Sequence, residues 1–300
     1  MLYRTLGKTG LRVSVIGIGT WQFGGEWGRT FSQAEVDAIL DEAAAAGINL
    51  IDTAECYGDH LAESLVGDYL SRRDRSRWII ATKFGHHFNQ FMDRTDLFSP
   101  SDLPPQLEAS LRALRLDSID LYQFHSGSDA RFLNQELWDL LATEKQAGKI
   151  GHLGVSIMQK GSETQAREAS RLGVETLQVF YNRLDRRAEQ IYFPHARRDQ
   201  LGVLARVPLA SGLLTGKYRA GVTFPANDVR ATFNPEKMQK DLAEIENIRA
   251  TEVPAGVPMS QWAIAWCLQD PVVAATIPGS KEPAQVRANA AAADLLTPPS

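Results

Sequence analysis

The chain has 300 residues, of which 44% are hydrophobic, and a formal net charge of −4. It therefore has no overall basic field for nucleic acid, and its apolar segments are too short or too interrupted to span a bilayer, so we expect neither kind of partner. The two cysteines, Cys56 and Cys267, lack metal-like or CxxC spacing, and no charged-then-apolar signal segment follows Met1. We expect a cytoplasmic protein.

Eight apolar runs rich in β-branched residues recur along the chain, and each is nearly continuous, as in strands buried on both faces of a parallel sheet. In chain order they are Val15 to Gly19, Ile48 to Asp52, Trp78 to Lys83, Ile119 to His125, Ile150 to Ser156, Thr176 to Asn182, Gly202 to Val207 and Val272 to Pro278. Helical patterns separate them, and no linker divides the chain. We predict one domain, residues 1–300, with the α/β architecture of a (β/α)8 TIM barrel.

Two helix starts carry the capping-box pattern of a serine followed three residues later by Glu or Gln. The first is Ser32 with Glu35, and Gly47 ends that helix. The second is Ser162 with Gln165.

Four segments lie outside the repeat. Residues 2–14 predict a β-hairpin that plugs one end of the barrel. Residues 84–103 and 216–234 are too long for ordinary connections, and both follow predicted strands, so they should overhang the mouth formed by the carboxyl ends of the strands. The tail after Asn289 is Ala-rich and then broken by prolines, so its last residues should form a loose end.

Two glycine motifs imitate nucleotide-binding loops. From Gly17 the pattern runs Gly-x-Gly-x-x-Gln, and the next helix does not begin until Ser32, so the glycines do not lie at a helix N-terminus. The stretch 212–218 has only three residues between Gly212 and Gly216, and Tyr218 replaces the magnesium-binding Ser/Thr of a P-loop. We reject both interpretations.

Other polar groups have simpler explanations than catalysis or metal binding. His86 and His87 are adjacent and have no third ligand at a metal-like spacing, so a solvated pair is expected and no metal is predicted. Cys56 has no evident base and is expected to be a partly buried small side chain. Asp52 and Glu55 come from one strand end, whereas a glycosidase needs carboxylates on opposite sides of a sugar.

Four ionisable residues should meet at the barrel mouth, because strand ends converge there whatever their separation in sequence. They are Asp52, Tyr57, Lys83 and His125. A lysine that ends a buried strand needs a carboxylate, which Asp52 on the neighbouring strand can supply. A purely structural ion pair is the alternative. The presence of Tyr57 favours a catalytic role over a purely structural ion pair, because a nearby ammonium stabilises the phenolate and lowers the phenol's pKa toward neutral pH.

This set of groups suits carbonyl reduction, in which an acid protonates the developing alkoxide and a neighbouring donor orients the carbonyl. Since no side chain supplies hydride, a nicotinamide would be required.

The chain resembles the aldo-keto reductase family in eight motifs that follow the family's order and spacing. They are "GIGTW", "NLIDTAECYG", "ATKFG", "DLYQFH", "GHLGVS", "LQVFYN", "PLASGLLTGKY" and "IPGSKEPAQVRAN". The resemblance implies that Tyr57 is the general acid/base, that Asp52 and Lys83 tune its pKa, and that His125 orients the carbonyl. It also implies that Trp21 and Phe84, with Tyr57 and His125, form the substrate site.

The resemblance further implies a cofactor, NADPH or NADH, bound across the mouth. The residues implied to bind it are Gly19, Thr20, Trp21, Asp52, Ser156, Gln178, Arg206, Pro208, Leu209, Ser211, Gly212, Leu214, Gly216, Lys217, Gly279, Ser280, Lys281, Gln285 and Asn289. Ser156 and Gln178 would hold the carboxamide.

The chain departs from the family at several of these positions. Ile157 replaces an Asn that contacts the cofactor, and Arg206 stands where many members have an aromatic residue that stacks on the nicotinamide. Lys281 resembles the basic residue that meets a 2′-phosphate, whereas Gln285 and Ala288 replace a frequent Arg and Glu. The balance favours NADPH, with NADH possible.

The resulting hypothesis is an NAD(P)(H)-dependent oxidoreductase that interconverts an aldehyde or ketone with its alcohol. One alternative is a nicotinamide-binding redox sensor with little turnover. Another is an isomerase or aldolase in which Lys83 forms a Schiff base. The expected partner is a small molecule, the expected state is a monomer or weak homo-oligomer, and loops 22–31, 84–103 and 219–234 should set substrate specificity.

Overall fold

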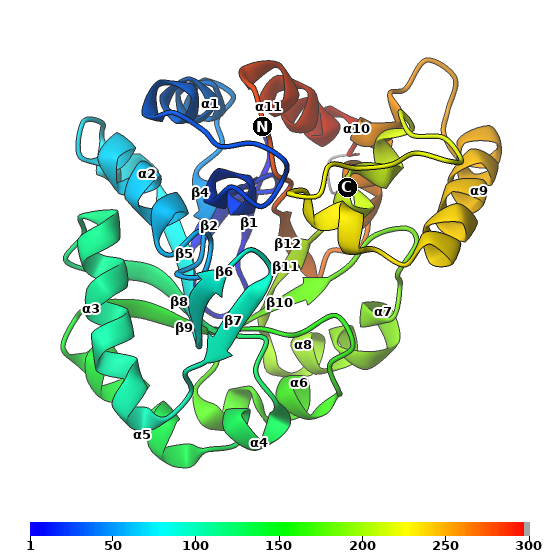
Figure 1. Cartoon of the computed structure of the whole chain (residues 1–300). Coiled ribbons are helices and arrows are strands. Elements are labelled where there is room, and N and C mark those ends of the chain that lie inside the picture. The colour runs from blue at the N-terminus through cyan, green and yellow to red at the C-terminus, as the bar shows by residue number, and fades with distance from the viewer. Residues whose placement is uncertain (297–300) are drawn as a thin grey trace.

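The computed structural model describes residues 1–296. Eight parallel strands pair in the order β12-β11-β10-β9-β8-β5-β4-β3. Parallel bridges from Ile16 to Thr276 and from Gly19 to Gly279 join the two ends of this sheet, so it closes into a (β/α)8 barrel ringed by helices (Figure 1). The predicted fold class is confirmed. Each of the eight predicted runs contains a strand, although β5 extends one residue past its run, to Phe84.

The elements follow the alternation that the sequence predicts. The barrel strands are β3 (Ile18–Gly19), β4 (Leu50–Asp52), β5 (Ile79–Phe84), β8 (Ile119–His125), β9 (Ile150–Ser156), β10 (Thr176–Phe180), β11 (Gly202–Arg206) and β12 (Val273–Thr276). The helices are α1 (Gln33–Ala45), α2 (Leu61–Leu70), α3 (Leu103–Leu114), α4 (Asp129–Phe132), α5 (Gln135–Gln146), α6 (Thr164–Glu168), α7 (Ala188–Ile191), α8 (Phe193–Asp199), α9 (Pro235–Thr251), α10 (Met259–Cys267) and α11 (Pro283–Ala290).

One of the two predicted capping boxes forms. The Ser32 side chain accepts from the backbone N–H of Glu35, whose carboxylate accepts from the backbone N–H of Ser32. The second prediction was wrong. The Gln165 amide does not return to Ser162 but donates to the carbonyl of Gly127 at 2.8 Å, which ties α6 to the loop that follows β8.

The N-terminal hairpin plugs the barrel as expected. Its strands, β1 (Tyr3–Thr5) and β2 (Arg12–Ser14), pair antiparallel. Leu6 and Val13 are fully buried and pack with residues of the barrel strands. Those residues are Leu50, Ala81, Leu121, Leu204, Ala274 and Ala275.

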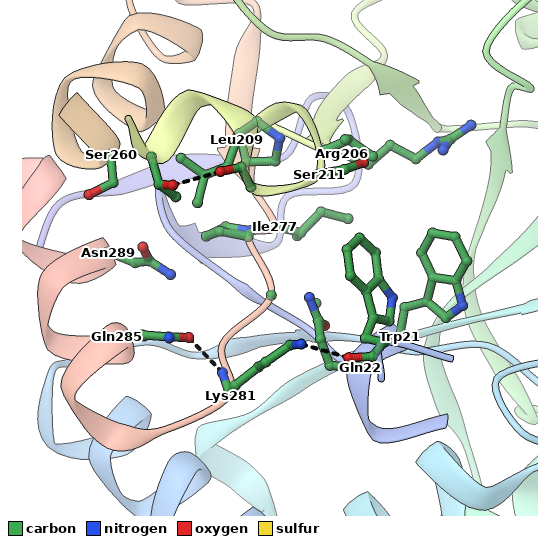
Figure 2. A pocket seen from close by; sticks show the side chains of 18 of the residues that line it. Trp21, Gln22, Arg206, Leu209, Ser211, Ser260, Ile277, Lys281, Gln285 and Asn289 are labelled. Atoms are coloured by element: carbon green, nitrogen blue, oxygen red, sulfur yellow. Dashed lines mark hydrogen bonds between the residues drawn. The ribbon is translucent and has the colours of Figure 1, made fainter. Parts of the chain in front are cut away.

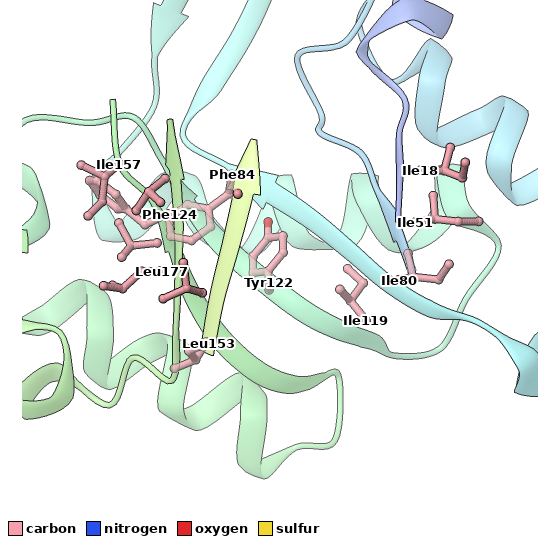
Figure 3. Packing of buried hydrophobic residues seen from close by; sticks show 14 of the residues in the cluster. Ile18, Ile51, Ile80, Phe84, Ile119, Tyr122, Phe124, Leu153, Ile157 and Leu177 are labelled. Atoms are coloured by element: carbon pink, nitrogen blue, oxygen red, sulfur yellow. The ribbon is translucent and has the colours of Figure 1, made fainter. Parts of the chain in front are cut away.

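Strand alternation divides each barrel strand between two environments, because successive side chains point to opposite faces. Ile51 and Ile80 face outward into the main core between the sheet and the helices (Figure 3). Leu50 and Ala81 face inward, onto the plug.

The long segments at the mouth are more ordered than loops. Residues 84–103 contain an antiparallel hairpin made of β6 (His86–Gln90) and β7 (Asp93–Asp96), which the sequence analysis did not anticipate. The loop before α9 joins the loop after β3 by backbone hydrogen bonds, from Gly28 N to Asn227 O at 3.1 Å and from Val229 N to Glu26 O at 2.9 Å.

None of the described helices is long and apolar enough to cross a membrane. The predicted loose end concerns residues 297–300, which lie outside the described residues. Just before them, Ala291–Leu295 forms a short 3-10 helix in which Ala292 and Ala293 are buried.

We expect Gly7→Ala to destabilise the protein more than Gly10→Ala does. Both glycines have positive φ, at +53° and +73°, so each alanine costs about 1–2 kcal/mol. An added Cβ at Gly7 would also lie 2.1 Å from the backbone N of Gly202, whereas at Gly10 it would meet no atom within 4 Å. The overlap adds about 1–3 kcal/mol. Urea unfolding measures the difference, and equal losses would contradict the packing of the plug.

Candidate active site

A polar layer lies inside the barrel, above the apolar layer that meets the plug. Two residues beyond Leu50, Ala81 and Leu121 along their strands, the inward positions hold Asp52, Lys83 and Gln123, and all three side chains are buried. The period of two therefore brings charged groups from different strands to one level of the barrel.

Lys83 makes three contacts at the centre of this layer. Its Nζ donates to Asp52 Oδ1 at 2.7 Å and to the Thr53 carbonyl at 2.6 Å, and lies 3.3 Å from the Tyr57 hydroxyl. Asp52 Oδ2 accepts from the amides of Gln178, at 2.6 Å, and Gln123, at 3.2 Å. The predicted meeting of Asp52, Tyr57 and Lys83 is therefore present.

The electrostatics differ from the expectation. Burial raises the pKa of Tyr57 to about 12, although the Lys83 ammonium opposes this rise. The prediction of a lowered pKa was wrong, because removing the phenolate from water raises the pKa more than the single Lys83 ammonium lowers it. Burial by itself would lower the pKa of Lys83, but the Asp52 carboxylate and the Tyr57 phenol outweigh it, so this pKa lies above its usual value.

His125 lies beside Tyr57, with their ring centroids 6.2 Å apart and the rings nearly perpendicular. Burial, with a contribution from His86, holds the pKa of His125 well below its usual value, so the imidazole is neutral at physiological pH. The predicted solvated histidine pair was wrong for His86, because its Nε2 lies 2.7 Å from the His125 carbonyl.

A buried carboxylate connects the loop after β3 to the β6–β7 hairpin. Glu26 accepts from Trp21 Nε1 at 2.8 Å, from the Met92 backbone N–H at 2.8 Å and from the guanidinium of Arg94. The Trp21 ring stacks near that of Tyr57, with centroids 6.0 Å apart. Trp21 therefore forms a wall beside the phenol, as predicted.

A cleft of about 340 Å³ opens at the mouth, within the range of small-molecule sites. Figure 2 shows Lys281, Gln285 and Asn289 at one end of it, with Trp21 and Arg206 at the other. Most of the predicted cofactor and substrate residues line it: Gly19, Thr20, Trp21, Asp52, Tyr57, Gln178, Arg206, Pro208, Leu209, Ser211, Gly212, Lys217, Gly279, Lys281, Gln285 and Asn289.

Seven predicted site residues are not among those that line the cleft. Two of them, Lys83 and His125, lie next to Tyr57, which does line it. Phe84 is 1% exposed and stacks on Tyr122 in the main core (Figure 3), because it follows the inward-facing Lys83 and so points outward. The other four are Ser156, Leu214, Gly216 and Ser280. Ser156 is fully buried, and its hydroxyl donates to Gln178 at 3.2 Å.

The remaining three have other surroundings. Leu214 belongs to the core beneath α9 and α10. Gly216 ends a 3-10 helix at positive φ against Met259. Ser280 is buried and accepts from the Asn289 amide.

Sequence reasoning missed other residues of the cleft. They are Gln22, Val207, Thr215, Tyr218, Arg230, Ser260, Ile277 and Pro278. Trp27, within the predicted specificity loop 22–31, and Ala288, named with Gln285 at the cofactor site, also line the cleft. Arg230 pairs with Asp228 and stacks on Phe224, 4.1 Å from the ring centroid. No periodicity in the sequence marks these loop positions. Gln123 was also missed, although its inward register beside Lys83 could have indicated it.

The cleft suits a polar ligand such as a dinucleotide. Gln22 Oε1, Trp27 Nε1 and Arg206 Nε are buried without a hydrogen-bond partner, and all three residues line the cleft. Buried polar atoms are nearly always paired in native structures, so a bound ligand would complete them. Lys281, whose Nζ donates to the Trp27 carbonyl at 2.7 Å, brings a positive charge to the same cleft.

One group in the described part of the chain has metal-ligating atoms close together. Glu55, Cys56 and His125 place theirs within 4.8 Å of one another. A cation there would meet the positive charges of Lys83 and Arg94, which already act on His125. The absence of a metal stays a prediction.

The chain matches the Aldo/keto reductase family over residues 15–299. It belongs to this family. Aldo-keto reductases are oxidoreductases that use NAD(P)H. The chain is 32% identical to the NADH-specific methylglyoxal reductase of Escherichia coli (strain K12) over 306 residues, covering 97% of this chain and 93% of the relative.

Solved structures of this aldo-keto reductase's relatives have the same fold. The aldo-keto reductase AKR11C1 from Bacillus halodurans, in its holo form, aligns with a TM-score of 0.83 at 29% identity, covering 100% of this chain and 93% of the other. The glycerol dehydrogenase AKR11B4 from Gluconobacter oxydans aligns with a TM-score of 0.80 at 30% identity, covering 93% and 86%.

The stability of the polar layer should depend on Lys83 and Asp52 together. We expect Lys83→Met to cost about 3–5 kcal/mol, because Asp52 is left as an unpaired buried charge. Asp52→Asn/Lys83→Met should cost at least about 1 kcal/mol less than the sum of the single changes. The free energies of unfolding in urea give this double-mutant cycle.

The exposed pair of Lys237 and Asp241, one turn apart on α9, provides the control. Lys237→Met should cost under about 0.5 kcal/mol. Additive losses at Lys83 and Asp52 would show that the buried pair is not coupled.

Proposed function

We propose that the protein is an NAD(P)(H)-dependent oxidoreductase that interconverts an aldehyde or ketone with the corresponding alcohol, with Tyr57 as general acid and base. The observation that supports it most strongly is the Tyr57 hydroxyl, 3.3 Å from Lys83 Nζ, in a residue that lines the cleft. Without this adjacent ammonium, the phenolate that remains after Tyr57 gives up its proton would not be stabilised.

Each residue has a defined task in this proposal. When bound, the nicotinamide supplies the hydride that reduces the carbonyl carbon. Tyr57 gives its hydroxyl proton to the carbonyl oxygen, and the Lys83 ammonium stabilises the phenolate that remains. Asp52 keeps Lys83 charged and in place, and neutral His125 donates to the same carbonyl oxygen.

The cleft walls set the conditions for proton transfer. The rings of Trp21 and Trp27 meet edge to face, with centroids 5.2 Å apart, and both residues line the cleft. They would exclude water from the carbonyl and so strengthen the interactions with Tyr57 and Lys83. The names of the relatives make methylglyoxal and glycerol the first carbonyl and alcohol to test.

Tyr57→Phe should lower kcat by about 10²–10⁴-fold, because the variant keeps the ring but lacks the proton donor. Cofactor binding, measured by fluorescence titration with NADPH, should change little. Steady-state reduction of methylglyoxal gives the rate. Tyr122→Phe is the matched control, since the Tyr122 hydroxyl is buried in the core without a partner, and it should leave kcat unchanged. A fully active Tyr57→Phe variant would refute the assignment.

The two reaction directions should depend on pH differently. Because burial raises the pKa of Tyr57 to about 12, the phenol stays protonated, and reduction should be flat from about pH 6 to 10. Alcohol oxidation needs the phenolate as a base, so its rate should rise by about tenfold for each pH unit over the same range. Initial rates in both directions at saturating cofactor test this, and a reduction rate that falls through pH 7 would contradict it.

We favour NADPH over NADH, because Lys281 brings a point charge suited to a 2′-phosphate. Lys281→Met should weaken NADPH binding by about tenfold and NADH binding much less. Thermal-shift titration with both cofactors measures the two affinities. Lys240→Met, on the exposed side of α9, should change neither. Equal losses for the two cofactors would indicate that Lys281 does not contact the 2′ position.

Multiple turnovers separate an enzyme from the alternative of a redox sensor. NADPH oxidation that continues well beyond one equivalent per protein supports the enzyme. A single stoichiometric turnover with every carbonyl tested would favour the sensor.

A further inference from the structure

The two ring nitrogens of His125 have different surroundings. Nδ1 lies 3.7 Å from Cys56 Sγ, within the length of a hydrogen bond to sulfur. The other nearby polar group, Glu55 Oε1, is 3.9 Å from Nδ1, too far for a hydrogen bond. Nε2 has no hydrogen-bond partner among the described residues, and the His125 side chain is 14% exposed.

The proposed reaction places a strict demand on this ring. A neutral imidazole carries one N–H, so one nitrogen donates and the other accepts. Because Nδ1 is held against Cys56, only Nε2 is free to donate to a substrate oxygen. Nε2 therefore has to carry the proton, and Nδ1 has to accept a hydrogen bond.

We propose that Cys56 is a positioning residue whose thiol donates its proton to His125 Nδ1 and so fixes the tautomer that carries the proton on Nε2. This inference rests on the proposed function for its catalytic consequence, but the tautomer itself can be observed without turnover. It gives a role to the buried Cys56 thiol.

The chain adjacent to Cys56 holds the thiol in place. Cys56 directly precedes Tyr57, and its carbonyl accepts from Arg94 Nη2 at 3.3 Å. Arg94 is in turn paired with the buried Glu26. The same contacts that orient Trp21 thus hold the backbone of Cys56, between the thiol that contacts His125 and the neighbouring Tyr57.

The charges around the ring agree with a neutral imidazole and a protonated thiol. Burial raises the pKa of the Cys56 thiol well above its usual value, and Glu55 adds to the rise. His86, Lys83, Arg206 and Arg94 all oppose a positive charge on His125, as its lowered pKa reflects.

Glu55, whose Oε1 lies 3.9 Å from Nδ1, could favour a proton on that nitrogen. Its Oε1 accepts from the backbone N–H of His86 at 3.0 Å. That bond engages the Glu55 oxygen that is nearest to Nδ1, at 3.9 Å. The Cys56 thiol lies closer to Nδ1, at 3.7 Å, and is therefore the hydrogen-bond partner we assign to this nitrogen.

The tautomer can be read from the ¹⁵N chemical shifts of protein labelled at histidine, without cofactor or substrate. The chain has six histidines, and the His125 signals are assigned by their loss in His125→Asn. The unmodified protein should show a protonated Nε2 and an unprotonated Nδ1. Cys56→Ala should show a mixture of both tautomers, and Cys56→Ser, which keeps a donor, should restore the Nε2–H form in part or in full.

Kinetics supply the second measurement. Cys56→Ala should lower kcat for carbonyl reduction by about 2- to 10-fold, the worth of one hydrogen bond, at unchanged NADPH affinity, and Cys56→Ser should recover activity in step with the tautomer. Cys267→Ala is the matched control. That cysteine is also fully buried, and its Sγ lies 3.4 Å from the Ala263 carbonyl, so its loss should lower stability without changing kcat or the His125 shifts.

A protonated Nδ1 in the unmodified protein, or an unchanged Nε2–H tautomer in Cys56→Ala, would overturn the inference even if the enzyme turns over. The expected tautomers in a protein that reduces no carbonyl would instead refute the proposed function and leave the role of the thiol intact.

Discussion

The ion pair between Lys83 and Asp52, with 2.7 Å between Nζ and Oδ1, is the interaction around which the barrel mouth is organised. Both side chains are buried, so each charge depends on the other and on further hydrogen bonds to offset the loss of water. Gln178, Gln123 and the Thr53 carbonyl supply those bonds. Groups from four strands, β4, β5, β8 and β10, are thereby tied into one layer, and Tyr57 lies against it.

The same burial governs the chemistry available to Tyr57. A phenol beside an ammonium in water would be a stronger acid, yet desolvation raises its pKa to about 12. The Lys83 ammonium therefore acts mainly when the proton leaves, by stabilising a phenolate that the surroundings otherwise disfavour. A raised pKa suits a proton donor, because Tyr57 stays protonated at neutral pH. The reverse reaction needs the phenolate, which forms only at higher pH.

The loops at the mouth are held by a few specific contacts. Glu26 joins the loop after β3 to the β6–β7 hairpin through Arg94, and Val229 N bonds to the Glu26 carbonyl from the loop before α9. One residue thus connects three segments that are distant in sequence. Because Trp21 also binds this carboxylate, the wall beside Tyr57 depends on how these loops close.

The sequence by itself determined the strands, the plug and three of the central residues, because apolar runs, turn residues and strand ends are local signals that the barrel then brings together. It did not determine which strand-end residues reach the cleft. Phe84 was placed in the substrate site but points into the core, since alternation sends the residue after Lys83 outward. Arg230 went unnoticed, because it meets Trp27 and the cleft only in three dimensions, across loops that are far apart in sequence. The direction of the Tyr57 pKa shift likewise needed the tertiary structure, because burial is a property of the folded chain and not of any motif.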